Sequence, residues 1–382
     1  MQTRKLYYED SALQRFEAKV LGCEAVAGGF EVMLDATAFY PTGGGQACDL
    51  GTLGSARVLD VFERGHQVVH LCDGALQVDS CVTGSIDYAR RLDLMQQHAG
   101  EHIVSGIICQ RFGLHNVGFH IGADVVTIDF DGPITAEQLS QVEKDANAAI
   151  AQDLPIEAFF PSPEELAVLP YRSKKALDWP IRIVRIPGID TCACCAVHLP
   201  STLHVRRIKL LSCVKFHQGV RIEMVCGQRA IDLLDKVFDQ NRQVSQAFSA
   251  KMLETGDAAR KVNERLAAAE YRCAGLQKQV FAAVAEGFAG REKVLYFGDL
   301  TPGQTRELAE AILPRISSSV LVCGGQEGKF SFCLASHDDV KAAGSALCAA
   351  LGGRGGGKPG FQQGTLRAEE GQIREFFREQ GA

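Results

Sequence analysis

Short apolar stretches separated by glycine and aspartate fill residues 1–88. Four of them have the length and composition of strands: EVMLDATAFY, ARVLDVF, QVVHLCDG and SCVTGSIDY. Closely spaced strands with turn residues between them are typical of antiparallel sheets, and a small sheet of this kind removes its exposed edges by closing on itself. We therefore predict a small N-terminal β-barrel domain over residues 1–88.

The pattern becomes helical at Tyr88. Apolar and histidine positions then recur at helical spacing up to an expected end near Gly113: Leu94, Met95, His98, Ala99, His102, Ile103, Gly106 and Ile107. We expect strands in VGFHIG, VVTIDF, IRIVRI and LHVRRIKLLSC, and a second helix in TAEQLSQVEKDANAAIAQD with Thr135 as its N-cap. Residues 89–225 thus predict an α+β domain in which helices pack on an antiparallel sheet.

A polar, glycine-poor segment with leucine and alanine at helical spacing begins near Arg229. It predicts a pair of long helices or a coiled-coil arm over residues 226–285, interrupted near Gly256. Residues 286–382 then alternate strands and helices: KVLYFGDL, TRELAEAILPRI, SVLVCGG, KFSFCLAS, a helix around Val340 to Leu351, the loop GGRGGGKPG and an amphipathic final helix. They predict a C-terminal α/β domain, and the chain as a whole has the pattern of an α+β protein.

The composition is that of a globular protein: 46% of the 382 residues are apolar and 23% are charged. No apolar run is long enough for a membrane helix, and the start MQTRKLYYED is no signal peptide. Fourteen cysteines without such a signal indicate reduced thiols, so we expect a cytoplasmic protein that contacts no membrane. The formal charge of −6 disfavours non-specific nucleic-acid binding, although local basic patches can still contact phosphate.

Two pairs of residues have the spacing of metal ligands: His98 and His102 in HAGEH, and Cys194 and His198 in CCAVH. Residues four apart on a helix lie on one face, so both imidazoles of the first pair can reach the same ion. The second pair adds a thiolate and a third imidazole, and four such ligands suit tetrahedral Zn²⁺. We therefore predict a zinc site, at which a displaced ligand would leave room for water or substrate.

Two other interpretations of HAGEH stay open. His98 to His102 also fits H-x-x-E-H, the signature of inverzincin proteases, in which Glu101 would be the general base. Alternatively, the two histidines belong to a helix without metal. The nearby thiol of Cys194 favours a metal site outside that protease group, because the protease is expected to use a carboxylate as its third ligand.

Two glycine-rich segments could approach a ligand closely. One is TAFYPTGGGQ, from Thr37 to Gln46, whose glycines permit positive φ; a tight hairpin is the alternative. The other is GGRGGGKPG, where Arg354 and Lys358 could join backbone N–H groups in contacting phosphate; a flexible surface turn is the alternative. Neither has the G-K-[ST] ending of a nucleotide-binding P-loop.

The ordered set TAFYPTGGGQ, QHAGEH, DTCACCAVH, a helical arm and GGRGGGKPG resembles the AlaX-type alanyl-tRNA editing proteins. The long form is the most similar, since it joins the editing domain of alanyl-tRNA synthetase to the C-terminal module of that enzyme. The similarity runs from about residue 5 to about residue 365. It implies a zinc-dependent aminoacyl-tRNA deacylase that acts in trans on tRNA(Ala) mischarged with serine, and also with glycine.

The resemblance also implies roles for individual residues. The zinc ligands would be His98, His102, Cys194 and His198, since the Asp-x-x-x-Cys-x-x-x-His spacing from Asp190 selects Cys194 over Cys192 and Cys195. The amino-acid pocket would be formed by Thr37, Gly43, Gly44, Gly45 and Gln46. Thr37 and Gln46 are candidate catalytic groups, as is Glu101, for which a solvated surface carboxylate is the alternative.

One motif departs from the family. Where the family has Cys-Gly-Gly-Thr-His, this chain has Cys194-Cys195-Ala196-Val197-His198. The change removes backbone freedom and a hydroxyl beside the metal, so a catalytically inactive tRNA-binding relative is an alternative function.

A hydrolytic sieve of this kind has a physical reason. A synthetase pocket for alanine separates it from serine or glycine by only about tenfold to a few hundredfold, so a second site that rewards the serine hydroxyl is useful. The ion could activate a water or anchor the substrate, and the residue types are compatible with both roles.

The tRNA would need basic contacts. Candidates near the editing domain are Arg90–Arg91, Lys174–Lys175, Arg182 with Arg185, and Arg206, Arg207 and Lys209. By resemblance, the C-terminal module with Arg354 and Lys358 would bind the tRNA elbow and contribute to a homodimer.

Overall fold

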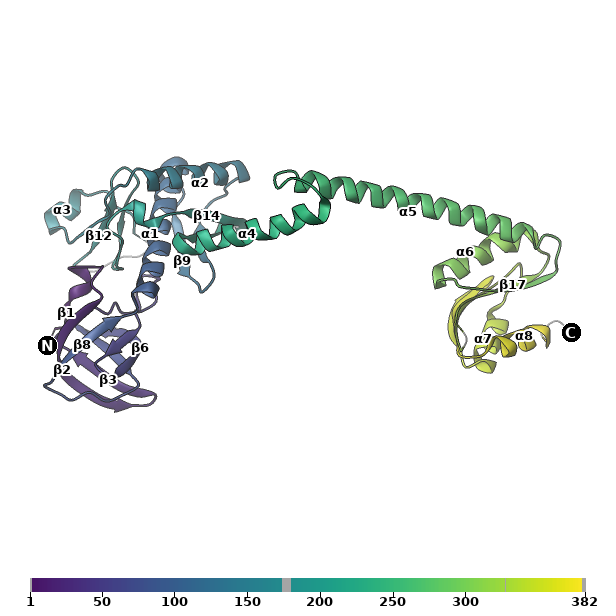
Figure 1. Ribbon diagram of the computed structural model, residues 1–382, viewed down its shortest axis with the longest axis horizontal. Helices are drawn as coiled ribbons and strands as arrows, with labels where there is room; N and C mark the ends of the chain where they lie inside the picture. The colour runs from purple at the N-terminus through teal and green to yellow at the C-terminus, as the bar shows by residue number, and fades with distance from the viewer. Residues whose placement is uncertain (1, 174–179, 327, 380–382) are drawn as a thin grey trace. The chain divides into compact units, whose positions relative to one another are not determined.

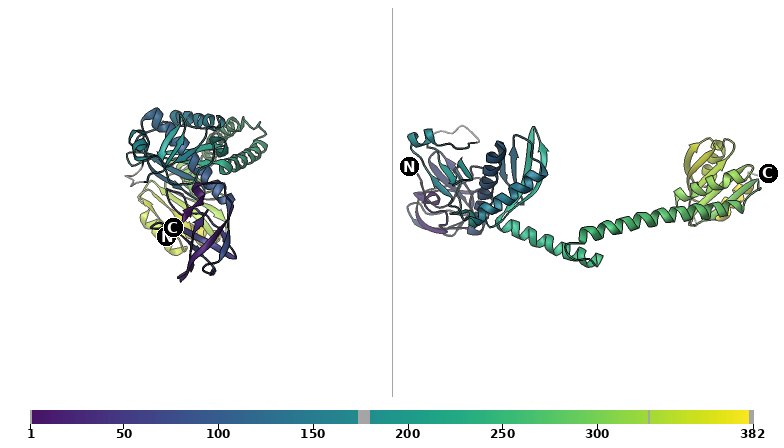
Figure 2. Two further views of the ribbon diagram at one scale, coloured as in Figure 1. Left: turned by 90° about the vertical axis from the view of Figure 1, so that its left-hand side faces the viewer. Right: turned by 90° about the horizontal axis from the view of Figure 1, so that it is seen from above.

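The computed structural model describes residues 2–173, 180–326 and 328–379. Its contacts divide the chain into two compact units, residues 1–243 and 244–382. Figure 1 labels the helices and strands of both units, and Figure 2 shows them from two further directions. Helix α4 (Gly227–Phe248) crosses the boundary between the units.

Six strands of the first unit form a closed barrel in the order β2-β3-β7-β6-β5-β8. Their bounds are β2 Arg15–Val26, β3 Gly29–Leu34, β5 Gly51–Leu53, β6 Ala56–Arg64, β7 Gln67–Cys72 and β8 Cys81–Ile86. Alternate side chains point inward and form one apolar cluster that includes Val20, Leu34 and Val61. Beside it, β1 (Arg4–Lys5) pairs in parallel with β4 (Ala36–Thr37). The barrel is the arrangement that the strand pattern predicts.

Helix α1 (Tyr88–Phe112) is the central element of the rest of this unit. Asp87 caps its first turn by accepting a hydrogen bond from the Arg90 N–H, and Gly113 ends it in the left-handed conformation, so the predicted end is confirmed. Sixteen of its residues are buried, including polar ones. A helix buried on every side brings its polar groups into contact with other elements, and here those groups include the HAGEH histidines.

Two antiparallel sheets and helix α2 pack around α1 (Figure 1). One sheet has the order β14-β15-β10-β9 and the other the order β11-β12-β13. Their bounds are β9 Asn116–Ile121, β10 Val126–Phe130, β11 Glu157–Phe159, β12 Ile183–Ile186, β13 Asp190–Ala193, β14 Ile208–Phe216 and β15 Gly219–Cys226, with helices α2 Ala136–Ala151 and α3 Pro163–Val168. Thr135 caps α2 as expected.

The expected strand LHVRRIKLLSC is only partly a strand. Residues Thr202–Val205 form a short 3₁₀ helix, η2, and β14 begins at Ile208. Arg206 between them has a φ of 67° and a ψ of −63°, and the Arg207 N–H donates to the carbonyl oxygen of Val205, so a tight three-residue turn interrupts extended backbone.

The helical arm consists of α4 and α5 (Thr255–Glu286), separated by residues 249–254. The predicted interruption near Gly256 therefore lies slightly earlier, since Gly256 is in the first turn of α5. Ser249, with a φ of 49°, ends α4. At its far end α5 packs against α6 through Phe281 and Ala285.

The second unit contains a mixed sheet in the order β16-β17-β18-β20-β19, in which only the pair β16 and β17 is parallel. The bounds are β16 Lys293–Gly298, β17 Ser319–Gln326, β18 Lys329–Ser336, β19 Arg354–Lys358 and β20 Phe361–Leu366, with α6 Pro302–Ile312, η3 Leu313–Arg315, α7 Lys341–Ala350 and α8 Glu370–Glu379. Apolar clusters cover both faces of this sheet.

The segment GGRGGGKPG is not the loop that we expected. Its residues Arg354–Lys358 form the edge strand β19, antiparallel to β20. Glycine permits this close pairing, because a Cβ at Gly357 would lie 2.1 Å from the carbonyl oxygen of Phe361. The described chain is thus a mixed α+β structure, and none of its helices has the length and apolar character needed to cross a membrane.

Candidate metal centre and cavity

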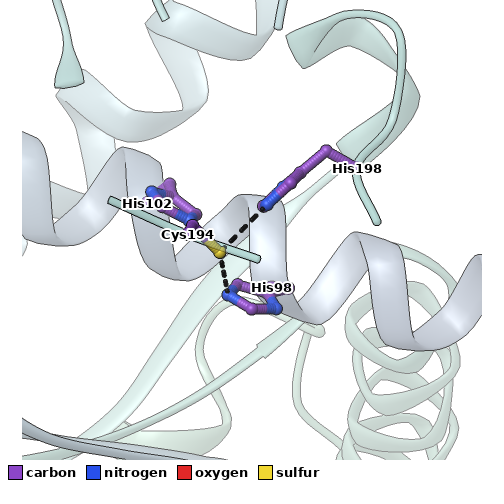
Figure 3. Close-up of side chains that lie close together, drawn as sticks. All are labelled: His98, His102, Cys194 and His198. Atoms are coloured by element: carbon purple, nitrogen blue, oxygen red, sulfur yellow. Dashed lines mark hydrogen bonds between the residues drawn. The ribbon is translucent and has the colours of Figure 1, made fainter. Parts of the chain in front are cut away.

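The four predicted ligands meet at one point in the first unit. The ligand atoms of His98, His102, Cys194 and His198 all lie within 4.8 Å of one another. The Cys194 sulfur lies 3.5 Å from Nε2 of His98 and 3.3 Å from Nε2 of His198. Figure 3 shows the thiol between these two imidazoles, with His102 one turn along the same helix as His98.

The outer nitrogens of the two helix histidines are held by other side chains. Nδ1 of His98 lies 3.0 Å from the amide oxygen of Gln46, and Nδ1 of His102 lies 2.8 Å from a carboxylate oxygen of Asp190. Since both oxygens accept, each imidazole donates through Nδ1 and keeps the Nε2 lone pair for the centre. Such support is usual for metal-binding histidines.

The donor set fits a metal ion. Nε2 of His102 is buried and has no hydrogen-bond partner among the described residues, which is costly unless another group binds it. Burial alone would raise the pKa of the Cys194 thiol, but the imidazoles of His98 and His198 outweigh it, and this pKa lies well below its usual range. A buried thiolate among three imidazoles matches the ligand chemistry of zinc.

The pKa values of two other members of this group, His198 and His102, shift in opposite directions. Burial lowers the pKa of His198 to about 3, so this imidazole stays neutral and able to coordinate. For His102 the direction is opposite: burial acts to lower its pKa, but the hydrogen bond to Asp190 outweighs burial and raises the pKa well above its ordinary value, so an ion must displace a proton from Nε2 before this imidazole can coordinate.

The Cys194 segment is held by a guanidinium. Arg182, nearly buried, donates to the carbonyl oxygens of Cys194 and Ala196 at 3.2 and 2.6 Å, and its guanidinium carbon lies 4.5 Å from the ring centroid of Tyr8. The Tyr8 hydroxyl donates to the carbonyl oxygen of Cys195 at 2.8 Å. These contacts fix the backbone on both sides of the thiol.

A cavity of about 1220 Å³ opens beside the cluster, and His98, His102 and Cys194 are part of its wall. The glycine turn forms another part, with Gly43, Gly44 and Gly45. Gly44 and Gly45 have φ values of 59° and 82°, and a Cβ at Gly45 would lie 2.5 Å from the Phe119 ring, so the turn needs glycine. The glycine segment is therefore both a tight hairpin and a part of the cavity wall, so the two interpretations of this segment are compatible.

Two expected pocket residues lie elsewhere. Thr37 is not part of the cavity wall: its side chain is buried in the barrel, where its hydroxyl lies 2.8 Å from Nε2 of His70. Thr37 on β4 therefore contacts the barrel core rather than the cavity. Gln46 lies behind His98 rather than in the wall, so its position is that of a support for a ligand.

Glu101 is not a solvated surface carboxylate. It is 1% exposed and lies in the cavity wall. One carboxylate oxygen accepts hydrogen bonds from the Ser105 hydroxyl at 2.8 Å and from the Asn116 amide. The helix is buried on this side, which periodicity did not indicate because His, Gln and Glu fill its inner positions.

The family departure at CCAVH affects one cavity residue. Ala196 and Val197 are fully buried in the core cluster, away from solvent. Cys195 lies in the cavity wall, with its sulfur 3.8 Å from the Tyr40 hydroxyl. An ideal Cβ at Gly44 would be 3.1 Å from that sulfur, so Cys195 closes tightly over the glycine turn.

The basic residues predicted to contact phosphate differ in burial and in hydrogen-bond partners. Arg91 cannot be one, because it is fully buried and hydrogen-bonded to Asp49 and to the carbonyl oxygen of Ala38. Arg182 lies in the cavity wall, where it also makes the backbone contacts described above. The other pairs are Arg185 with Glu157, Lys209 with Glu143 and Arg206 with Gln228, whereas Arg90 donates to the carbonyl oxygen of Cys48.

Arg207 is exposed, as are Arg354 and Lys358 on β19 in the second unit. Lys174 and Lys175 lie outside the described residues.

Sequence reasoning missed Tyr8, Tyr40 and Asn116, and also Arg172, which donates two hydrogen bonds to the Asp190 carboxylate. Asn116 stands at the start of β9 and Tyr8 near the chain start, so no motif joins them to the site. Tyr40 stands inside the quoted segment TAFYPTGGGQ and is the one that closer attention to that motif could have found.

Comparison with known proteins shows that this chain is similar to alanyl-tRNA editing proteins and to part of alanine–tRNA ligases. The family model described as threonyl and alanyl tRNA synthetase second additional domain matches residues 181–223, which contain Cys194 and His198. An alanine–tRNA ligase from Thermofilum pendens is 32% identical over 387 residues, which are 95% of this chain and 42% of the ligase. An alanyl-tRNA editing protein from Mus musculus is 27% identical over 385 residues, which are 94% of this chain and 93% of that protein.

The chain therefore spans less than half of the ligase but nearly all of the editing protein. Among solved structures, the C-Ala domain from Aquifex aeolicus alanyl-tRNA synthetase matches 22% of this chain and 84% of that domain at 21% identity, with a TM-score of 0.20, too low to assign a fold.

Proposed function

We propose that this chain, which is homologous over nearly its whole length to alanyl-tRNA editing proteins, hydrolyses the ester that joins serine, and also glycine, to tRNA(Ala). The observation that carries the proposal is the meeting of His98, His102, Cys194 and His198 at the wall of a large cavity. An aminoacyl ester is activated, so positioning and charge stabilisation meet most of the catalytic demand.

We propose Zn²⁺ as the metal, held by those four side chains. The support is the thiolate with three imidazoles, together with the unpartnered Nε2 of His102. A zinc ion supplies Lewis acidity and can lower the pKa of a water bound to it. Ligands supplied from both α1 and the segment after β13 keep the cluster at the cavity.

The cavity wall offers the groups that would position a substrate. The glycine turn lets the backbone come close, and Tyr40, whose hydroxyl donates to the carbonyl oxygen of Gly43 at 3.1 Å, braces this turn. Glu101 is held by Ser105 and Asn116, and we propose that this carboxylate accepts or donates a proton in the cavity. Gln46 acts through His98, and Thr37 stabilises the barrel next to the turn.

A catalytically inactive tRNA-binding relative is the second candidate function, and one observation favours it. Cys195 replaces a family glycine and lies directly over Gly44, so it narrows the cavity beside the metal cluster. The inverzincin alternative lacks such support, because no glutamate joins the cluster within the part of the chain that the structure describes.

A deacylation assay tests the proposal. The wild type, loaded with zinc, is expected to release serine and glycine from tRNA(Ala) and to spare Ala-tRNA(Ala), whereas His102→Ala is expected to lose this activity. Retention of serine on tRNA by the zinc-loaded wild type would exclude an enzyme and leave the inactive relative. Equal hydrolysis of Ala-tRNA(Ala) would exclude the discrimination.

The protease alternative is tested by Cys194→Ser. Loss of bound zinc is expected for the editing site, because the substitution removes a thiolate ligand. A protease site with a distant carboxylate ligand would keep its zinc in this variant.

We also propose that tRNA(Ala) binds to both units, in the cytoplasm, with residues 89–225 contributing most of the hydrolytic site and residues 286–382 the exposed Arg354 and Lys358. All cysteines in the described chain are free thiols, as a reducing compartment requires.

We propose a homodimer to which, besides the C-terminal module of residues 286–382, helix α5 contributes by pairing with α5 of a second copy. Its small and apolar side chains alternate at spacings of three and four through Ala259, Val262, Leu266, Ala269, Cys273, Leu276, Val280 and Ala283, the pattern of a coiled-coil seam. Leu266 and Leu276 are 55% and 50% exposed. Arg265 and Glu270 flank the seam at positions that meet across a parallel dimer.

A further inference from the structure

A chain of three side chains leads from the metal cluster into the protein. His102 donates through Nδ1 to Oδ2 of Asp190 at 2.8 Å, and Arg172 grips the same carboxylate with two hydrogen bonds, from Nε to Oδ1 and from a terminal nitrogen to Oδ2, both at 2.7 Å. We propose that Arg172 is a positioning residue, which holds Asp190 against His102 and so strengthens metal binding.

The main chain of Arg172 is hydrogen-bonded to β13, the strand that carries Asp190. Its N–H donates to the carbonyl oxygen of Thr191 at 2.8 Å, and its carbonyl oxygen accepts from the N–H of Ala193 at 2.9 Å. Strand β13, which carries Asp190 and leads into Cys194, is therefore bound by both the backbone and the side chain of Arg172. A shift of Arg172 would disturb two ligands, His102 through Asp190 and Cys194 through β13.

Arg172 acts from behind the site. It lies in the wall of a separate recess of about 390 Å³ that also includes Gly106 and Asp190, and it is not part of the wall of the larger cavity. The effect of its side chain must therefore pass through Asp190 rather than through a bound substrate. The Arg172 side chain is 17% exposed and that of Asp190 only 2%.

Burial explains why a guanidinium is needed. A carboxylate inside a protein is stable when its oxygens are paired, and removal of one partner leaves an uncompensated group. Asp190 has two oxygens to orient and His102 binds only one, so the two-pronged contact of Arg172 fixes the rotation of the carboxylate. Partners behind a metal ligand typically change metal affinity by about 10–100-fold when they are removed.

The test measures zinc affinity of the full chain by competition with a chromophoric chelator. Arg172→Gln is expected to bind zinc about 10–100-fold more weakly than the wild type, and Arg172→Lys to lie between them, because lysine keeps the charge but not the fork. The matched control is Arg221→Gln, which removes an equally bidentate arginine, bound to Asp129 at 2.7 and 2.8 Å on β10 and β15. It is expected to bind zinc like the wild type.

A double-mutant cycle separates positioning from general destabilisation. If Arg172 acts through Asp190, the Arg172→Gln and Asp190→Asn double variant binds zinc no more weakly than Asp190→Asn alone. Wild-type affinity in Arg172→Gln, or losses that add in full in the double variant, would overturn the inference. If Arg172→Gln does not fold, Arg172→Lys enters the cycle in its place.

The inference rests on the proposed metal centre. The same chelator competition distinguishes failure of the metal centre from failure of the role of Arg172. A wild type without measurable zinc affinity would reject the centre itself. A wild type that binds zinc tightly, with Arg172→Gln equally tight, would reject only the role of Arg172.

Discussion

Gln46 and His98 are neighbours in space, with the amide oxygen of Gln46 3.0 Å from Nδ1 of His98. Gln46 ends the glycine turn after β4, whereas His98 stands in the middle of α1. This one contact joins the segment that forms the cavity wall to the helix that carries two ligands. A hydrogen bond therefore connects the glycine turn to the group formed by His98, His102, Cys194 and His198.

The contact predicts that Gln46→Ala weakens zinc binding by about tenfold, because the imidazole of His98 would be free to rotate. The measurement is chelator competition with the full chain. Gln152→Ala, which changes an exposed glutamine after α2, serves as the control and should bind zinc normally. Undiminished affinity in Gln46→Ala would show that His98 is oriented by other contacts.

Any side chain at position 106 should destabilise the protein. A Cβ there would lie 2.3 Å from the carbonyl oxygen of Ile189 and 2.8 Å from Cβ of Asp190, so α1 and β13 can approach only at glycine. Gly106→Ala should lower the unfolding free energy by about 1–3 kcal/mol and weaken zinc binding, since it pushes Asp190 away from His102.

Gly275→Ala is the control for that substitution. Gly275 lies inside α5 with open space around its Cβ position. Alanine should stabilise this helix by roughly 0.5–1 kcal/mol. Denaturant unfolding would measure both variants, and the same sign for both would contradict the packing argument.

The buried His70 should make the stability of the barrel depend on pH in the acid range. Burial lowers its pKa from 6.5 to about 4, so between these values the unfolded chain binds a proton that the folded barrel excludes. Stability from this group is complete above about pH 6.5 and is lost as the pH falls toward about 4, a total of about 3 kcal/mol. His70→Gln should lose this part of the pH dependence.

Unfolding free energies of both proteins at about pH 7 and about pH 5 would check the prediction, and the wild type should lose about 2 kcal/mol more than His70→Gln. Parallel losses in the two proteins would mean that His70 is not the group that titrates.

Leu266 predicts the assembly of α5. Leu266→Lys should abolish pairing with a second copy, because it places a charge at the centre of the seam. Tyr271→Lys is the control, since Tyr271 is 85% exposed and lies off the seam on the same helix. Light scattering on the full chain measures the mass. A single-chain mass for the wild type would reject the proposed dimer.

Local pattern was enough for the long elements and for the ligand pairs. The ends of α1, the cap of α2 and the strands of the barrel depend on residues close together in the sequence, as does the fourfold spacing of His98 with His102 and of Cys194 with His198. These features are set by backbone geometry over a few residues, so one sequence can reveal them.

Contacts between distant segments decided the rest. Only the folded chain brings Asp190 and Arg172 behind His102, turns Thr37 toward His70, buries Glu101 and Arg91, and pairs the glycines of β19 with β20. No spacing along the chain encodes these outcomes, because each depends on which face of an element its tertiary neighbours cover. The sequence by itself therefore determined which residues could hold a metal, and the tertiary structure determined what holds those residues.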